Sequence, residues 1–268
     1  MNTAEAELYS SISLGVEGPV ATLRLTRPEI RNALSGLQMI DELTDALVSV
    51  RDDPNIVVLI VTGEGDAFSA GGDLRDMRKR SGLFAGETPD EVALAYRTGI
   101  QRVPKVLATM NTITIAAVNG PAIGAGCDLA LMCDLRIAAR DAVFAESFVK
   151  IGLISGDGGA WFLPRIVGMQ RAIELLVTGR TLSADEAVAI GMVLETVPRE
   201  HLLSRAGELA RQISRNGPAA VRMMKRLLMA SPNLALEPFL DVCAEYQGTC
   251  QTSDEHRAAL SHLLDRRP

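Results

Sequence analysis

The stretch TITIAAVNGPAIGAGCDLALM, residues 112–132, decides the fold of this protein. Its first seven residues, Thr112–Val118, are apolar or β-branched without interruption, which is typical of a strand buried on both faces. The sequence Asn119-Gly120-Pro121 then breaks the strand, and Gly124–Met132 is predicted to be a short helix. The stretch therefore predicts a buried strand, a glycine-rich loop and a helix in that order.

The same order occurs upstream, around a second buried strand. Ile56–Val61 is a continuous aliphatic run, and the glycine-rich stretch GEGDAFSAGGD, residues 63–73, follows it. Asp73 is placed to cap the amino end of the next helix. Apolar residues at helical spacing predict helices over Gly36–Val50 and Val92–Leu107. This alternation of strands and helices indicates an α/β domain built around a buried sheet.

The remaining segments extend this pattern at both ends. Near the start, Gly18-Pro19 separates two short runs, Ser11–Val16 and Val20–Leu25, and predicts a β-hairpin. Beyond residue 158 helices dominate, with one strand expected over Met192–Val197. The other predicted elements are the strand Leu135–Ala139 and the helices Ala160–Val167, Arg171–Val177, Ala184–Ile190, Glu200–Arg215, Pro218–Met229, Leu236–Gln247 and Ser253–Leu264.

We divide the chain into a core, residues 1–200, and a helical region, residues 201–268. The helical region is predicted to have apolar faces that are too large for a monomer to bury. They are therefore predicted to pack against a partner subunit.

Composition limits the class of protein. Of the 268 residues, 47% are hydrophobic and 22% charged, which suits a soluble globular protein. The net charge of −6 argues against a nucleic-acid partner, because nucleic-acid binders carry a basic surface. The sequence contains no run of about 18 apolar residues, so it predicts no membrane span. Residues 1–10 lack the apolar core of a signal peptide, so a cytoplasmic location is expected.

The cysteines and histidines do not predict a metal site. None of the cysteines forms a CxxC pair or has a histidine cluster beside it, so each is expected to be a small buried hydrophobe. The histidines all lie in the helical region and are expected to be exposed. These residues are Cys127, Cys133, Cys243, Cys250, His201, His256 and His262.

The two glycine-rich loops, residues 65–73 and 119–128, are the candidate sites of chemistry. Glycines let a backbone approach a ligand closely, and free N–H groups at a helix start favour negative charge. Neither loop has the Lys-Ser/Thr ending of a P-loop or the GxGxxG of a dinucleotide site. Two interpretations stay open: tight structural turns, or an oxyanion hole with one N–H from each loop.

Several segments together carry a resemblance to a known family. They are DAFSAGGDL (66–74), TITIAAVNG (112–120) with GAGCDLA (124–130), RPEIRNAL (27–34), and GLI (152–154) with GG (158–159) and LPRIVG (163–168). In this order they resemble the first oxyanion loop, the central motif, the early coenzyme A loop and the segment beyond the site of the crotonase (enoyl-CoA hydratase/isomerase) superfamily. The resemblance covers about residues 10–265, and its motifs are specific in combination.

The resemblance implies a fold, a substrate and a set of site residues. The fold would be a spiral of ββα units with a helical C-terminal trimerisation region, assembled as a homotrimer or a hexamer. The substrate would be an acyl-CoA thioester, which brings coenzyme A with it, so no separate cofactor and no metal are implied. The oxyanion donors would be the backbone N–H groups of Ala70 and Ala125. The residues lining the thioester and coenzyme A would be Arg31, Ala33, Ala70, Gly71, Gly72, Asp73 and Gly124.

The acid and base groups depart from the family's hydratases, which use two glutamates. The first would fall at Asp128, a shorter acid, and the second at Phe148, which cannot transfer a proton. Asp157, in the turn SGDGG of residues 155–159, is the preferred replacement base, and Glu146 is a weaker candidate. Asp157 could instead be an ordinary turn or N-cap aspartate, and Asp128 a residue that orients water.

Enoyl-CoA hydration is therefore the leading predicted function, in fatty-acid or related acyl-CoA breakdown. Double-bond or ring isomerisation by a single aspartate is the next candidate, followed by hydrolysis of a β-diketone carbon–carbon bond. Two candidates come from other classes of protein: a non-catalytic acyl-CoA binder, motivated by Phe148, and an RNA-binding relative, which the acidic charge disfavours. The length of acyl chain that the site accepts is expected to depend on the path of residues 81–90.

Overall fold

A twisted six-stranded sheet forms the centre of the computed structural model, which describes residues 9–265. The strand order is β1-β2-β3-β4-β6-β9, and every neighbouring pair is parallel except the predicted β1–β2 hairpin, which is confirmed. These strands are β1 Ile12–Glu17, β2 Val20–Leu25, β3 Val58–Gly63, β4 Ile113–Val118, β6 Leu135–Ala139 and β9 Glu195–Val197. A small second sheet contains β5 Ala122–Ile123, β7 Val143–Ala145 and β8 Leu182–Ser183.

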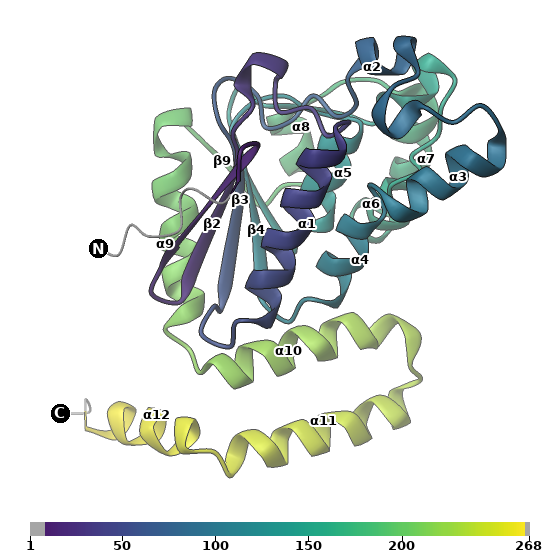
Figure 1. The fold of residues 1–268 in the computed structure, drawn as a ribbon. Helices are drawn as coiled ribbons and strands as arrows, with labels where there is room; N and C mark the ends of the chain where they lie inside the picture. The colour runs from purple at the N-terminus through teal and green to yellow at the C-terminus, as the bar shows by residue number, and fades with distance from the viewer. Residues whose placement is uncertain (1–8, 266–268) are drawn as a thin grey trace.

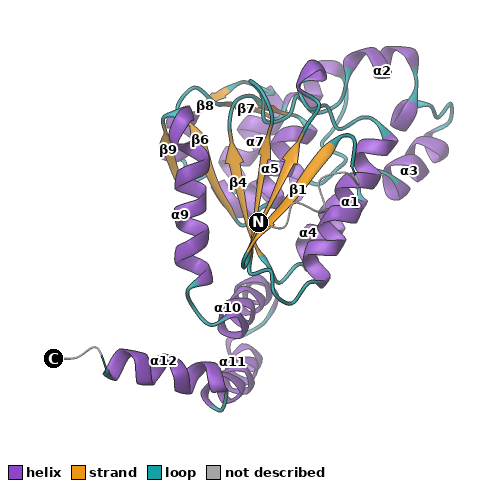
Figure 2. Ribbon diagram, turned by 60° about the vertical axis from the view of Figure 1, so that its left-hand side comes forward, coloured by secondary structure: helices purple, strands orange, loops and turns teal. Residues whose placement is uncertain are grey.

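Helices cover both faces of the large sheet, as Figures 1 and 2 show. On one face lie α1 Leu37–Asp52, α4 Arg102–Thr109 and α5 Ala125–Met132, and on the other lies α9 Leu202–Ser214. Because both faces are covered, every residue of β3 is buried, as its continuous aliphatic sequence predicts. The α/β prediction is confirmed.

The remaining helices surround the upper edge of the sheet or continue beyond it. The α-helices are α2 Leu74–Lys79, α3 Pro89–Thr98, α6 Gly159–Val167, α7 Met169–Thr178, α8 Ala184–Ala189, α10 Pro218–Ala230, α11 Leu236–Gln251 and α12 Asp254–Leu264. Short 3-10 helices span Pro28–Ile30, Gly82–Phe84, Ser147–Ile151, Arg199–His201 and Ser231–Asn233. Asp73 caps α2 as predicted, since its side chain accepts a hydrogen bond from the Arg75 N–H.

Two sequence predictions of element bounds are wrong. The helix predicted over Val92–Leu107 is two helices, α3 and α4, because the chain turns at Gly99, where a Cβ would lie 2.4 Å from the Leu83 side chain. The strand predicted from Met192 begins only at Glu195. The N–H groups of Met192 and Val193 instead bond to the Ala187 carbonyl and close the end of α8.

The helical tail lies apart from the sheet only from α10 onward. The helix α9 falls within the region assigned to oligomerisation, yet it packs on β2, β3, β4 and β6 with its small apolar residues buried. The helices α10, α11 and α12 then run below the amino ends of the strands (Figure 1). The helices α11 and α12 bury no residue within this chain. No helix within residues 9–265 is long and apolar enough to cross a membrane.

A buried ion pair attaches α10 to the sheet. The Lys225 ammonium donates to the Thr112 carbonyl at 2.8 Å and to the Asp134 carboxylate at 2.6 Å, and Lys225 is 5% exposed. Removing one partner of a buried pair leaves the other charge uncompensated. We expect Lys225→Met to lower the free energy of unfolding by about 3 kcal/mol. Urea unfolding would measure this.

The matched control for this prediction is Arg226→Met, one residue further along α10. Arg226 donates to Asn111 in an exposed position, so its loss is expected to cost less than about 1 kcal/mol. Equal losses in the two variants would show that the Lys225 pair has no special role.

Candidate active site

The two glycine-rich loops meet above the carboxyl ends of β3 and β4. The backbone of Ser69 pairs with the other loop, since its carbonyl accepts the Ile123 N–H at 3.0 Å. Two glycines permit this contact. A Cβ at Gly120 would lie 2.0 Å from the Asp66 carbonyl oxygen, and one at Gly126 would lie 2.3 Å from that of Ser69. The glycines therefore place one loop directly against the other.

Two residues with free N–H groups line a narrow cavity at this junction. The cavity has a volume of about 30 Å³, and Gly72 and Ala125 both line it. Ala125 is the first residue of α5, so its N–H has no partner within the helix. Among residues 9–265, no acceptor is bonded to the N–H of Gly72 or of Ala125. The pair is available to a developing oxyanion.

The prediction that Ala70 supplies an oxyanion donor is wrong. The N–H of Ala70 is already donated to the Arg31 carbonyl at 2.8 Å. This bond, together with the one from the Leu34 N–H to the Gly71 carbonyl at 2.7 Å, holds the segment of residues 27–34 against the first loop. Gly72, which the sequence places only among the lining residues, is the N–H left free.

The other predicted lining residues surround the same junction. Arg31 is exposed and has a left-handed backbone, with φ of 51°, and Ala33 is buried next to it. Gly71 contacts the second loop, where a Cβ would lie 3.0 Å from the Ala125 nitrogen. The Asp73 carboxylate is occupied by its cap and by an ion pair with Arg75. Their contact with coenzyme A remains a prediction.

Phe148 stands beside the predicted oxyanion hole. Its ring lies 3.6 Å from the position of a Cβ at Gly124, and it lines the narrow cavity together with Met77 and Tyr96. The Met77 methyl lies 2.3 Å from where a Cβ at Gly72 would be. A ligand that enters this narrow cavity therefore has to displace side chains, and the unbranched Met77 is suited to move. Phe148 makes this wall apolar.

Three carboxyl groups meet behind the cavity. Asp128 on α5, Glu146 after β7 and Asp157 before α6 are 0%, 3% and 3% exposed, respectively. The Asp128 carboxyl interacts with both the Glu146 and the Asp157 carboxyls, and each affects its pKa. Asp128 also accepts a bond from the Ser155 hydroxyl at 2.9 Å. Of the three, Asp157 lines the cavity.

The cluster needs protons to be stable. Within the described part of the chain, no N–H or O–H donor outside the cluster reaches either Glu146 oxygen, Asp128 Oδ1 or Asp157 Oδ1. Burial, and then the neighbouring carboxyl, raises the pKa of Asp128 and of Asp157 well above the ordinary range. Burial raises the pKa of Glu146 to about 7. The carboxyl groups therefore share protons at neutral pH.

The raised pKa of Glu146 predicts a pH-dependent stability. The carboxyl has a pKa of 4.5 in the unfolded chain and of about 7 in the folded protein. Its contribution to the free energy of unfolding is therefore complete below pH 4.5 and is lost as the pH rises through 7. The loss corresponds to about 3 kcal/mol. Glu146→Gln is expected to flatten this fall when urea unfolding is compared at pH 5 and pH 8. The control Glu200→Gln, at an exposed position, should keep the wild-type dependence of unfolding free energy on pH. The same dependence in Glu146→Gln would show that Glu146 is not the group that titrates.

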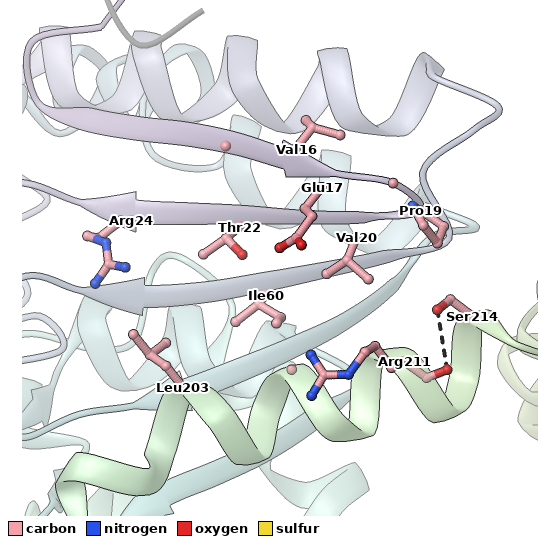
Figure 3. A pocket seen from close by; sticks show the side chains of 13 residues that line it. Val16, Glu17, Pro19, Val20, Thr22, Arg24, Ile60, Leu203, Arg211 and Ser214 are labelled. Atoms are coloured by element: carbon pink, nitrogen blue, oxygen red, sulfur yellow. Dashed lines mark hydrogen bonds between the residues drawn. The ribbon is translucent and has the colours of Figure 1, made fainter. Parts of the chain in front are cut away.

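A separate groove lies on the opposite face of the sheet, between β1–β3 and α9 (Figure 3). Glu17, Arg24 and Arg211 lie along it, and its volume is about 610 Å³. None of the described residues that line it belongs to the predicted site. Residues 9–265 also hold no group of three or more His, Cys, Asp or Glu arranged to bind a metal ion.

Known proteins share this arrangement of loops and helices. The enoyl-CoA hydratase/isomerase family profile matches residues 15–268. The chain belongs to this family. A crotonyl-CoA hydratase from Syntrophomonas wolfei is 36% identical over 97% of this chain and 96% of its own. The 1,2-epoxyphenylacetyl-CoA isomerase of Escherichia coli is also 36% identical, over 94% of both chains.

A solved structure of the enoyl-CoA hydratase/isomerase family confirms the fold. The enoyl-CoA hydratase of Bacillus anthracis superimposes with a TM-score of 0.88 and 33% identity, covering 96% of this chain and 97% of that one. Hydratases and an isomerase are thus similarly close to this chain, and overall similarity does not separate the two reactions. The side chains of the site have to do so.

Proposed function

We propose that this protein is an enoyl-CoA hydratase, which adds water across the double bond of a 2-enoyl-CoA. One observation carries the proposal: the buried Asp128–Asp157 pair adjoins the cavity into which the N–H groups of Gly72 and Ala125 are free to donate. An oxyanion hole and a carboxyl pair that holds a proton supply the two requirements of the reaction.

In the proposed mechanism the two N–H groups hold the thioester oxygen. Asp157 acts in the state in which the proton of the pair lies on Asp128, and it removes a proton from water as the water oxygen attacks C3 of the enoyl group. The electrons of the double bond move to the thioester oxygen, where the N–H groups and the start of α5 stabilise the negative charge. A proton from the carboxyl pair then adds to C2. Asp128 holds the shared proton and positions Asp157.

Isomerisation is the second candidate, and Phe148 favours it. An apolar ring on the cavity wall disfavours a bound water, whereas a single carboxyl can carry a proton from C4 to C2 of a 3-enoyl thioester. The β-diketone hydrolase gains no support, because the three histidines lie in or just before the C-terminal helices α9 and α12, away from the cavity lining.

A proton NMR time course with crotonyl-CoA in deuterated water tests the proposal. Formation of 3-hydroxybutyryl-CoA is expected. Double-bond migration of a 3-enoyl-CoA without hydration would move the assignment to isomerase. Binding of the thioester with no exchange of its α-proton would identify a non-catalytic acyl-CoA binder.

We further propose that the protein assembles as a homotrimer, or as a hexamer of two trimers, in the cytoplasm. The assembly is supported by large apolar side chains left exposed on α10–α12: Met224, Leu228, Met229, Leu236, Leu240, Leu260, Leu263 and Leu264. Light scattering after size exclusion is expected to give a mass of three or six times 28.7 kDa. A monomer would contradict the assignment of the tail.

A further inference from the structure

A second, larger cavity adjoins the narrow one. Its volume is about 740 Å³, and residues of α2, α3 and the segment 151–156 line it. Figure 1 shows α2 and α3 at the edge of the molecule. Met77, Phe84, Tyr96 and Leu153 line both cavities. A ligand that fills the narrow cavity can therefore extend into the larger one past these four side chains.

Three arginines and no acidic side chain line the larger cavity. Arg78 and Arg80 come from the end of α2, and Arg97 comes from the last turn of α3. None of the three forms an ion pair within residues 9–265. Arg80 donates one bond to the Gly86 carbonyl at 2.7 Å.

Of the acids close in sequence to the cavity lining, two are engaged elsewhere, and Glu87 and Asp90 are exposed outside the lining. Asp76 on α2 accepts bonds from Ser35 and Ser81, and Glu91 on α3 completes a capping box with Thr88. The rest of the chain carries an acidic excess, with a net charge of −6. Three positive charges along one cavity whose lining holds no acid favour an anionic ligand.

The walls between the arginines are apolar. Leu74, Ile151 and Ile154 line the cavity and are 61%, 48% and 78% exposed. A cavity of this kind suits a ligand with an apolar body and an anionic end. Guanidinium groups bind carboxylates and phosphates through paired hydrogen bonds.

We propose that Arg78, Arg80 and Arg97 bind an oxyanion of the thioester substrate. The proposal rests on the proposed acyl-CoA function and adds a substrate class to it. Two parts of the substrate could carry this chemistry: a carboxylate at the far end of a dicarboxylic acyl chain, or a phosphate of coenzyme A.

Calorimetric binding of saturated thioesters tests the proposal. The probes are adipoyl-CoA, which ends in a carboxylate, hexanoyl-CoA, which does not, and the two corresponding pantetheine thioesters, which lack the phosphates. The variant is Arg78→Gln with Arg97→Gln, and both residues are exposed, so the fold should be kept, as circular dichroism can check. The matched control is Lys79→Gln, which removes a charge from the same helix outside the cavity lining.

The four thioesters distinguish an acyl carboxylate from a coenzyme A phosphate as the bound oxyanion. If it is an acyl carboxylate, the double variant should bind adipoyl-CoA at least about tenfold more weakly and hexanoyl-CoA as tightly as wild type. If it is a phosphate, both CoA thioesters should weaken equally and both pantetheine thioesters should be unaffected.

Two outcomes would overturn the proposal: a double variant that responds no more than Lys79→Gln, or a wild type that binds neither CoA thioester. Because saturated thioesters cannot be hydrated, this result is independent of whether the protein is a hydratase.

Discussion

Replacing Asp157 by Asn is expected to lower kcat for hydration of crotonyl-CoA by about 10³-fold while acyl-CoA binding persists. Asn keeps the size of the side chain and its place beside Asp128 but cannot take a proton from water. Asp157 is the member of the carboxyl cluster that lines the narrow cavity, so the substrate meets this group. The free N–H groups of Gly72 and Ala125 are unchanged, so under the proposed mechanism they still bind the thioester oxygen.

Two measurements are needed for this prediction. Initial rates of crotonyl-CoA hydration give kcat, and calorimetry with the saturated butyryl-CoA gives binding without turnover. The control is Asp185→Asn, an exposed acid in the first turn of α8, which should keep wild-type kcat. Wild-type kcat in Asp157→Asn would remove this residue from the mechanism, whereas loss of butyryl-CoA binding would mean that the substitution disturbs the cavity itself.

Gly159→Ala is expected to lower kcat by about 100-fold through a single methyl group. A Cβ at this position, the first of α6, would lie 1.7 Å from Asp128 Oδ1 and 2.8 Å from Ser155 Oγ. Asp128 would have to shift, and because its carboxyl interacts with Ser155, Glu146 and Asp157, the shift would disturb its arrangement with Asp157. Displacing a catalytic group by about 1 Å costs on the order of 10²-fold in rate.

The matched control is Gly248→Ala, in the exposed helix α11. No atom lies within 4 Å of the added methyl there, so kcat should not change and the helix should be slightly more stable. In Gly159→Ala, a raised KM with wild-type kcat would show that Asp128 serves binding and not proton transfer. Asp128→Asn, which leaves Gly159 intact, is expected to reproduce the loss of kcat.

The sequence by itself determined the first strands of the large sheet, the two loops and the family. A continuous aliphatic run such as Ile56–Val61 is stable only where both faces are covered, so its burial depends on composition alone. The capping role of Asp73 depends only on the chain next to it, because its side chain accepts the N–H of Arg75. Phe148 could be read directly from the motif, because a substitution inside a recognised segment needs no coordinates. These are properties of short stretches of chain.

Other features depend on distances between residues far apart in the chain, and only the tertiary structure decided them. Glu146 was a weak candidate because the sequence favours a solvated or helix-supporting charge at this position and does not reveal that the side chain is buried beside Asp128. The spacing of the loop could not tell Ala70 from Gly72, because the difference is a bond to Arg31, 39 residues earlier in the chain.

The arginine-lined cavity has the same origin. Arg78 lies on α2 and Arg97 on α3. The single helix predicted over Val92–Leu107 did not include the break at Gly99 that separates α3 from α4. Local sequence sets which backbone conformation each segment adopts. The protonation of a buried carboxyl, the freedom of an N–H and the charge of a cavity are set by neighbours that folding brings together, so they had to be found in the structure.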